Sequence, residues 1–276
     1  MASLYKEKNL EILIATQDRA NLDFLVPMFP FGHFSDFNIL IVNQSQTFVL
    51  ESDFPSVRVI NSKEVGLPKS RNLAINNAIK EICIIADDDV VYVENFEKEI
   101  VEAFNSITNA SIITFNHQRI GLDYPQNNIK DGYWHDRKTI RKVCSIEIAF
   151  KLNDVKKSGS FFDDYFGLGC YFETADEFLF LRSMLNFNLK LYYSPKVILY
   201  HPLISSGEEQ NSDRIVYARA ALNYKMYGYW AYLWLFKYVF FLYRNKYLDH
   251  NEWGHKFKIG IAGIKKYKEL EKGKNK

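Results

Sequence analysis

Cysteine is scarce in this chain, which has only Cys83, Cys144 and Cys170 among its 276 residues. The three are far apart and no two form a Cys-x-x-Cys pair, so neither a zinc ribbon nor a disulfide framework is indicated. We expect buried free thiols and a reducing compartment. The N-terminal sequence MASLYKEKNLEILIAT has charges where a signal peptide would be apolar. A cytoplasmic rather than a secreted protein is therefore predicted.

A strong excess of charge of either sign is also missing. The formal net charge is +2, and no broad basic face can be inferred from it, so we expect no nucleic-acid partner. The charge is nonetheless uneven along the chain. Residues 226–276 contain 11 Lys or Arg against four Asp or Glu, a net charge of +7, which leaves −5 for residues 1–225. This asymmetry predicts a soluble body followed by a C-terminal segment that meets an anionic surface.

Internal repeats and low-complexity segments are absent, and short apolar runs dominate the first half of the chain. These runs lie at residues 10–16, 38–43, 57–60 and 81–87. Their length and polar boundaries favour strands that are buried on both faces of a parallel sheet. Helical patterns cover residues 68–81 and 94–104. Strands alternating with helices predict an α/β fold with an open, mostly parallel sheet.

The second half of the chain has a less regular pattern. We expect two strands, a long polar loop and a helix, at residues 110–115, 145–150, 117–142 and 175–187 respectively. A pair of strands is predicted over residues 189–201, with its turn at Ser194-Pro195, because proline is common in turns.

Three consecutive aspartates, Asp87, Asp88 and Asp89, follow the apolar run that begins at residue 81. Adjacent carboxylates raise the cost of ionising one another unless a cation lies among them. Ligands of open α/β sheets bind beyond the carboxyl ends of the strands, and in extended backbone Asp87 and Asp89 would share a side. An acidic turn without a ligand is one interpretation. The other is a site for Mg²⁺ or Mn²⁺, which would in turn hold the phosphates of a ligand.

The segment VGLPKSRNLAINNAIKEICIIADDDVVYVENF resembles the central signature of family 2 glycosyltransferases. In that family a Gly-x-x-x-x-Arg-Asn segment opens a helix, which leads into a strand that ends in an Asp-x-Asp motif. The matching residues here are Gly66, Arg71, Asn72, Asp87 and Asp89. The resemblance implies a GT-A type fold, with a Rossmann-like, mostly parallel sheet flanked by helices and, here, a C-terminal aromatic helical extension.

Two segments nearer the N-terminus extend the resemblance. The sequence ATQDR (15–19) is similar to the family's first nucleotide-binding loop, and IVNQS (41–45) lies where many members carry an aspartate pair that reads the base. Asn43 and Gln44 replace those acids and can still hydrogen-bond a base edge. The nucleotide-sugar-binding residues implied by the resemblance are Thr16, Arg19, Asn43, Gln44, Gly66, Arg71, Asp87 and Asp88.

The sequence FGLGCYFETADEFLFLR (166–182) resembles the acceptor-site segment of bacterial polysaccharide and capsule-type glycosyltransferases. There, a Gly-Glu-Glu or Gly-Glu-Asp triplet opens a helix and supplies the general base. Ala175, Asp176 and Glu177 match the triplet, with its glycine lost. An acceptor hydroxyl is a poor nucleophile at neutral pH, so a carboxylate must take its proton. Asp176 or Glu177 is the predicted base, and we favour Glu177, which aligns with the second acid.

A histidine follows a predicted strand in YHPLISSG (200–207). Members of the family often have a histidine there that completes the coordination of the metal. The resemblance therefore implies Asp89, Asp87 and His201 as ligands of Mn²⁺ or Mg²⁺.

The segment MYGYWAYLWLFKYVFFLYR (226–244) is apolar and aromatic, with Lys237 as its internal charge. A spanning helix needs about 20 apolar residues, but Tyr and Trp favour the membrane interface. Arg244, Lys246 and the lysines beyond them would meet anionic lipid headgroups. We predict an amphipathic or hairpin segment in peripheral contact with the inner face of the cell membrane. The alternative is a helix packed on the catalytic body.

These inferences divide the chain into a GT-A domain at 1–225, with nucleotide-sugar and acceptor halves at 1–115 and 116–225, and an extension at 226–276. The resemblance implies a metal-dependent, inverting, hexosyltransferase-type enzyme of polysaccharide biosynthesis. Its expected donor is a UDP-sugar and its acceptor a glycan or a lipid-linked glycan. One alternative is a nucleotidyltransferase, although ATQDRANLDF lacks the usual glycine-rich loop. The other is a non-catalytic scaffold that binds sugar nucleotides or polysaccharide, for which the loss of glycine at Ala175 leaves room.

Overall fold

The computed structural model describes residues 4–122, 124–202 and 211–274. The chain forms two compact units. The first comprises Met1–Phe162 and Glu177–Leu203, and the second Asp163–Asp176 and Ile204–Lys276. The predicted boundary between residues 225 and 226 falls inside helix α5 (Asp213–Tyr227), which belongs to the second unit.

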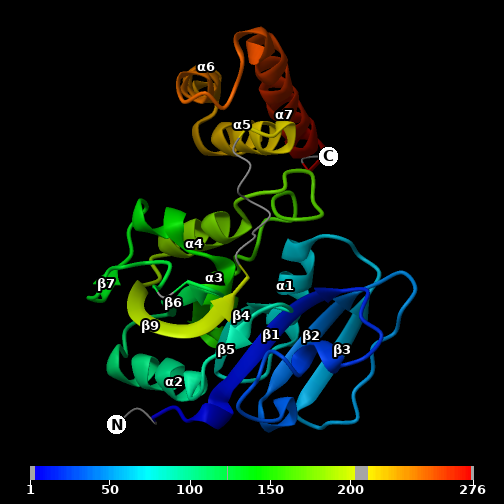
Figure 1. Cartoon of the computed structure of the whole chain (residues 1–276), viewed down its shortest axis with the longest axis vertical. Coiled ribbons are helices and arrows are strands. Elements are labelled where there is room, and N and C mark those ends of the chain that lie inside the picture. The colour runs from blue at the N-terminus through cyan, green and yellow to red at the C-terminus, as the bar shows by residue number, and fades with distance from the viewer. Residues whose placement is uncertain (1–3, 123, 203–210, 275–276) are drawn as a thin grey trace. The chain divides into compact units, whose positions relative to one another are not determined.

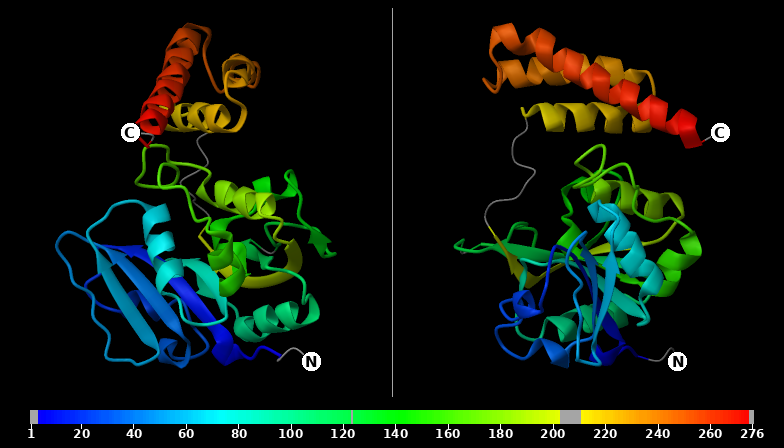
Figure 2. Two further views of the ribbon diagram at one scale, coloured as in Figure 1. Left: turned by 180° about the vertical axis from the view of Figure 1, so that it is seen from behind. Right: turned by 90° about the vertical axis from the view of Figure 1, so that its right-hand side faces the viewer.

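The first unit is an α/β structure built on one sheet. The strands of this sheet within the described residues are β1 (Leu10–Gln17), β2 (Ile39–Gln44), β3 (Val57–Ser62), β4 (Ile82–Asp87), β5 (Val91–Tyr92), β6 (Ile112–Arg119), β7 (Tyr133–Trp134), β8 (Ile148–Lys151) and β9 (Leu191–His201). The helices are α1 (Leu67–Asn77), α2 (Phe96–Ser106), α3 (Leu152–Ser158) and α4 (Asp176–Asn186). The strand order is β3-β2-β1-β4-β8-β6-β9-β5, with β7 paired to β9, and helices cover both sides of the curved sheet (Figures 1 and 2).

The pairing of the strands confirms the predicted fold class. The parallel pairs β1–β2, β1–β4, β2–β3 and β6–β9 each join six or seven residues, and the antiparallel pairs join two or three. Strands β1, β2 and β4 are buried along almost their whole length. Burial of both faces is what the continuous apolar runs predicted, because helices pack on each face of a parallel sheet. The prediction is wrong for the run at 57–60, because Val57 is the only buried residue of β3.

The predicted strand pair at residues 189–201 is wrong. These residues contain a single continuous strand, β9, in which Pro195 lies at an interior position. Proline has no N–H to donate, so it is tolerated in a sheet mainly at edges and bulges. The pairing of β9 with β6 shifts its register between Thr114 and Asn116, next to Pro195. The proline therefore marks a bulge within one strand rather than a turn between two.

Three other predicted elements differ in extent. The helix predicted over 68–81 ends at Asn77, because Ala78 is extended and the next two amide groups donate to the Glu11 carboxylate. The strand predicted at 145–150 begins with a 3₁₀ turn, η5 (Ser145–Glu147). The predicted loop at 117–142 includes the end of β6, the short strand β7 and a second 3₁₀ turn, Thr139–Lys142.

Within its described residues, the second unit contains three packed α-helices, α5, α6 (Trp230–Arg244) and α7 (Trp253–Lys274). Gly228, at φ 58°, separates α5 from α6. Helices α5 and α7 approach closely at Gly263, where an added Cβ would collide with the backbone of Tyr217. Across the described residues, we find no helix that is both long enough and apolar enough to cross a membrane.

Candidate active site

The predicted nucleotide-binding residues meet at the carboxyl ends of three adjacent strands of the first unit. Thr16 of β1 lies opposite Asn43 of β2, and Ala15 lies opposite Asp87 of β4. Carboxyl ends of parallel strands open at the same edge of a sheet, which is where ligands bind in open α/β folds. The structure therefore brings together segments that are about 70 residues apart in sequence, as in the contact of Thr16 with Asp88.

Asp87 is held by a buried arginine. Nη2 of Arg71 donates to Oδ1 of Asp87 at 2.8 Å and to Oγ of Ser145 at 2.9 Å. The Arg71 side chain is 3% exposed, whereas that of Asp87 is 31% exposed. A buried guanidinium needs a counter-charge, so this pair fixes the last residue of β4 and leaves part of its carboxylate open to a ligand.

Asp88 is held by the loop that follows β1. Nε and Nη2 of Arg19 donate to Oδ2 of Asp88 at 2.9 and 2.7 Å, and the Thr16 hydroxyl donates to the same oxygen. Asn43 fixes the backbone of this arginine, accepting from its N–H at 3.1 Å and donating to its carbonyl at 2.9 Å. Four of the predicted site residues thus form one hydrogen-bonded cluster.

Gln44 and Gly66 are also in contact. Nε2 of Gln44 donates to the carbonyl oxygen of Gly66 at 3.0 Å. Gly66 precedes α1 at φ 124°, a backbone conformation that residues with a Cβ rarely adopt. Asn72, the other polar residue of the motif, instead exchanges two hydrogen bonds with the backbone of Phe162, at 2.8 and 2.9 Å. These two bonds connect α1 to the backbone at Phe162.

Asp89 faces His201. Strand β4 ends at Asp87, so the alternation expected of extended backbone does not reach Asp89, and each of the three aspartates contacts a different partner. Oδ1 of Asp89 lies 3.7 Å from Nε2 of His201. Burial raises the pKa of Asp89; His201 opposes this shift, and the Asp87 and Asp88 carboxylates add to it. A cation at this point would reduce the electrostatic repulsion among the three clustered carboxylates.

The orientation of His201 fits a metal ligand. Its Nδ1 lies 3.0 Å from the carbonyl oxygen of Pro202, which can only accept, so Nδ1 carries the proton. Nε2 is therefore the ring nitrogen that faces the Asp89 carboxylate, where it can donate a proton to that carboxylate or, without its proton, bind a cation together with it. Among the described residues, no three His, Cys, Asp or Glu side chains lie close enough together to hold a metal ion. The predicted trio is therefore not assembled as a three-ligand site: Asp89 and His201 face each other, whereas Asp87 is directed at Arg71.

Three polar residues that sequence reasoning missed also lie in this region. Ser145 accepts from Arg71. His117 Nδ1 lies 2.8 Å from Oε1 of the buried Glu147, and the His117 ring lies edge-on to that of His201 at 6.0 Å. The signal was present in SIEIAF (145–150), because a glutamate inside a buried apolar run requires a partner. Its partner, 30 residues away in sequence, could not be named from that run alone.

Glu177 and Asp176 open helix α4, as predicted. Glu177 belongs to the same compact unit as the aspartates, whereas Asp176 is assigned to the other unit and is only 6% exposed. Burial raises the pKa of the Cys144 thiol, and the charges of Glu147, Glu177 and Asp87 raise it further. Glu177 and Asp87 both belong to the first unit.

Ala175 has the backbone conformation that explains a glycine in the family triplet. Its φ is 63°, in the left-handed region, where a Cβ costs roughly 1–2 kcal/mol. We predict that Ala175→Gly stabilises the protein by roughly 0.5–1 kcal/mol after the extra chain entropy of glycine is subtracted. Ala103→Gly, in the interior of α2, should instead cost about 1 kcal/mol. Equal losses of thermal stability in the two variants would contradict this reading of Ala175.

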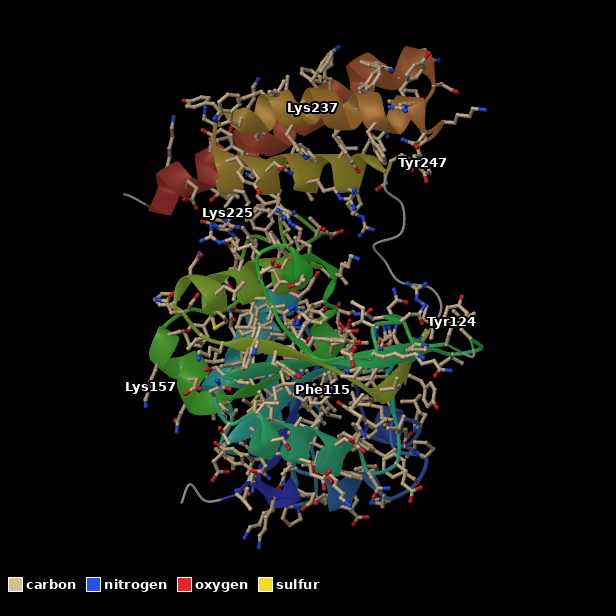
Figure 3. The ribbon with its side chains drawn as sticks, turned by 90° about the vertical axis from the view of Figure 1, so that its left-hand side faces the viewer. Phe115, Tyr124, Lys157, Lys225, Lys237 and Tyr247 are labelled. Atoms are coloured by element: carbon tan, nitrogen blue, oxygen red, sulfur yellow. The ribbon has the colours of Figure 1, made fainter. Side chains whose placement is uncertain are left out.

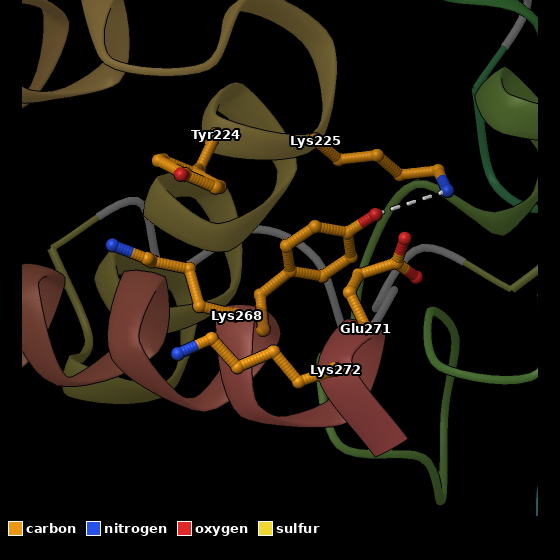
Figure 4. Close-up of a pocket in the computed structure, with 6 residues that line it drawn as sticks. Tyr224, Lys225, Lys268, Glu271 and Lys272 are labelled. Carbon is orange, nitrogen blue, oxygen red and sulfur yellow. Dashed lines mark hydrogen bonds between the residues drawn. The ribbon is translucent and has the colours of Figure 1, made fainter. Parts of the chain in front are cut away.

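A separate pocket of about 350 Å³ lies in the second unit (Figure 4). It is lined by Tyr224, Lys225, Tyr267, Lys268, Glu271 and Lys272. Lys225 is already engaged, because its Nζ lies 2.9 Å from Oδ2 of Asp163 and 3.4 Å from the Tyr267 hydroxyl. None of the predicted site residues lines this pocket.

Comparisons with known proteins identify the fold. No protein-family model and no curated protein matches the sequence. The structure of S. aureus TarS 1-349 in complex with UDP matches with a TM-score of 0.56 and 14% identity, covering 92% of this chain and 80% of that one. The structure of S. aureus TarS 1-349 in complex with UDP-GlcNAc matches with a TM-score of 0.56 and 13% identity, covering 92% of this chain and 81% of that one.

The fold is that of S. aureus TarS. A longer TarS structure matches with a TM-score of 0.52 and 14% identity, and the match covers 81% of this chain. The match spans only 41% of the length of that TarS chain. The likeness confirms the predicted GT-A type α/β fold, with a mostly parallel sheet flanked by helices. At this level of identity the comparison establishes the architecture, and the reaction has to be argued from the residues.

Proposed function

We propose that this chain transfers a sugar from a UDP-sugar to a hydroxyl group of a glycan or lipid-linked glycan in the synthesis of a bacterial polysaccharide. The observation that carries the proposal is the aspartate cluster at the end of β4. Two of its members are fixed by guanidinium groups, and the third faces a histidine. The UDP and UDP-GlcNAc complexes of TarS, which has the same fold, support the choice of a uridine donor.

On this proposal, each group of residues in the donor half of the site has its own role. Asn43 and the loop that carries Arg19 would contact the base, and the amide carbonyl of Gln44 can accept from a base N–H. Arg71 and Arg19 hold Asp87 and Asp88 in place. The residues that would hold Mn²⁺ or Mg²⁺ are Asp89, Asp87 and His201. When bound, such an ion neutralises the charge that develops on the departing nucleotide diphosphate.

The acceptor half depends on one carboxylate. Glu177 is partly exposed at the start of α4 and is our candidate for the base that takes the acceptor's proton. Direct attack of that hydroxyl on the anomeric carbon forms the new glycosidic bond and breaks the bond to the nucleotide. A single displacement of this kind inverts the configuration at the anomeric carbon.

The proposal is tested by a panel of nucleotides and nucleotide sugars, screened by thermal shift with Mn²⁺ present. Because a ligand that binds only the native state stabilises it, UDP at about 100 times its Kd should add about 2.7 kcal/mol. For a chain of this size we expect a rise in Tm of roughly 5–10 °C. Failure of every uridine nucleotide to raise the Tm, with or without Mn²⁺, would overturn the proposed donor. Hydrolysis of the bound donor by the purified protein then separates an enzyme from a scaffold.

A further inference from the structure

Helix α6 in the second unit is apolar on both of its faces. The side that packs against α5 and α7 carries Ala231, Leu235, Tyr238, Val239 and Leu242, which are all buried. Those residues explain the helix as part of a three-helix core. They do not explain the opposite side, which a water-soluble helix would cover with polar groups.

The exposed side of α6 is also hydrophobic. Its exposed positions are Trp230, Leu233, Phe236, Lys237, Phe240, Phe241, Tyr243 and Arg244. The apolar members are 39–73% exposed, with Trp230 at 73% and Phe236 at 55%. Their spacing of three, four and seven residues places them on one stripe, so they form a continuous apolar surface rather than scattered positions. We call these eight residues the α6 outer face.

The only charges on the α6 outer face are positive. Lys237 and Arg244 are seven residues apart, which places them on the same stripe as the aromatic rings, and Figure 3 shows Lys237 on α6 and Tyr247 just beyond its end. Between residues 214 and 248 the sequence contains six Lys or Arg and no Asp or Glu. A partner for this surface must therefore accept large apolar side chains and offer negative charge beside them.

We propose that the α6 outer face docks on an anionic lipid membrane, with the helix lying in the plane of the interface. Tyr and Trp prefer the headgroup region, and basic side chains beside an apolar face meet anionic lipid phosphates. A helix of 15 residues is about 22 Å long, shorter than a membrane span. A second copy of this chain fits less well, because a two-fold contact would bring the basic side chains against their own equivalents.

This inference stands independently of the proposed donor chemistry, because all of its residues lie in the second unit. The test is flotation of the full chain with vesicles of phosphatidylcholine, either alone or containing phosphatidylglycerol. We expect the protein to float with the anionic vesicles, and added salt should weaken the binding. Protein that stays in the soluble fraction with anionic vesicles at low salt would overturn the proposal.

Two double variants separate the apolar and the electrostatic contributions. Phe236→Ser/Phe240→Ser should lower the vesicle partition coefficient at least tenfold, and Lys237→Glu/Arg244→Glu should lower it by more than about tenfold on anionic vesicles only. Phe187→Ser and Lys157→Glu change exposed residues of the first unit and serve as matched controls. The Lys237→Glu/Arg244→Glu variant and the two controls should keep the Tm of the unchanged chain, since the substituted side chains are exposed. The Phe variant also removes two edge-on ring contacts with Trp253, so its Tm should fall slightly while the protein stays folded. Unchanged partition in both α6 variants, or a dimer that only the Phe variant abolishes, would overturn the membrane assignment.

Discussion

Asp89→Ala is expected to lower the rate of sugar transfer about a thousandfold while leaving the protein folded. The carboxylate faces His201 and is the member of the aspartate cluster that no arginine contacts among the described residues. Removing it takes away the charge that would hold a divalent cation, a loss of several kcal/mol of transition-state stabilisation. Because the Asp89 side chain is 52% exposed, its removal should change the stability by little.

The measurement is the initial rate of transfer, or of donor hydrolysis, with the UDP-sugar and Mn²⁺ concentrations held fixed. Asp89→Asn keeps the size of the side chain and removes its charge, so it should lose nearly as much activity as the alanine variant. Asp131→Ala changes an exposed aspartate of the β6–β7 segment and should keep full activity. Wild-type rates in both Asp89 variants would remove this carboxylate from the reaction.

The amino-acid sequence was a good guide to the parallel half of the sheet. The runs at 10–16, 38–43 and 81–87 became β1, β2 and β4, because a strand buried on both faces has to be apolar throughout. The place of the aspartates at a carboxyl end followed from the same reasoning, whereas Thr16, Arg19 and Asn43 were implied by the family resemblance. The local pattern did not give the strand order, in which β4 lies next to β1 rather than next to β3.

The sequence was a poor guide where long-range partners decide the structure. Pro195 has the local signature of a turn, and only the bulge in the pairing with β6 shows why it sits inside a strand. His117 and Glu147 each look unremarkable until they are found 2.8 Å apart. Asp87, Asp88 and Asp89 are the same residue type at consecutive positions, yet each has a different partner. Asp87 contacts Arg71, Asp88 contacts Arg19 and Asp89 faces His201. The local sequence pattern predicted where the site lies, but it could not predict which partner each aspartate contacts.

Glu177→Gln is expected to lower the transfer rate by about 10²–10⁴ and to leave donor binding unchanged. A general base contributes about that much, and glutamine keeps the shape of the side chain without its ability to take a proton. The structure favours this residue over its neighbour. Glu177 is partly exposed and belongs to the same compact unit as the aspartate cluster. Asp176 is 6% exposed, which leaves little room for an acceptor hydroxyl.

Asp176→Asn provides the matched comparison. Because the Asp176 carboxylate is buried at the start of α4, its loss should lower the stability by about 1–3 kcal/mol rather than remove the chemistry. We therefore expect Asp176→Asn to have a lower Tm and a transfer rate within tenfold of the wild type. Glu177→Gln should show the opposite pattern, with a normal Tm, a normal thermal shift on UDP and little transfer. A reversal of these two patterns would assign the base to Asp176, because only the residue that takes the proton loses rate without losing the fold.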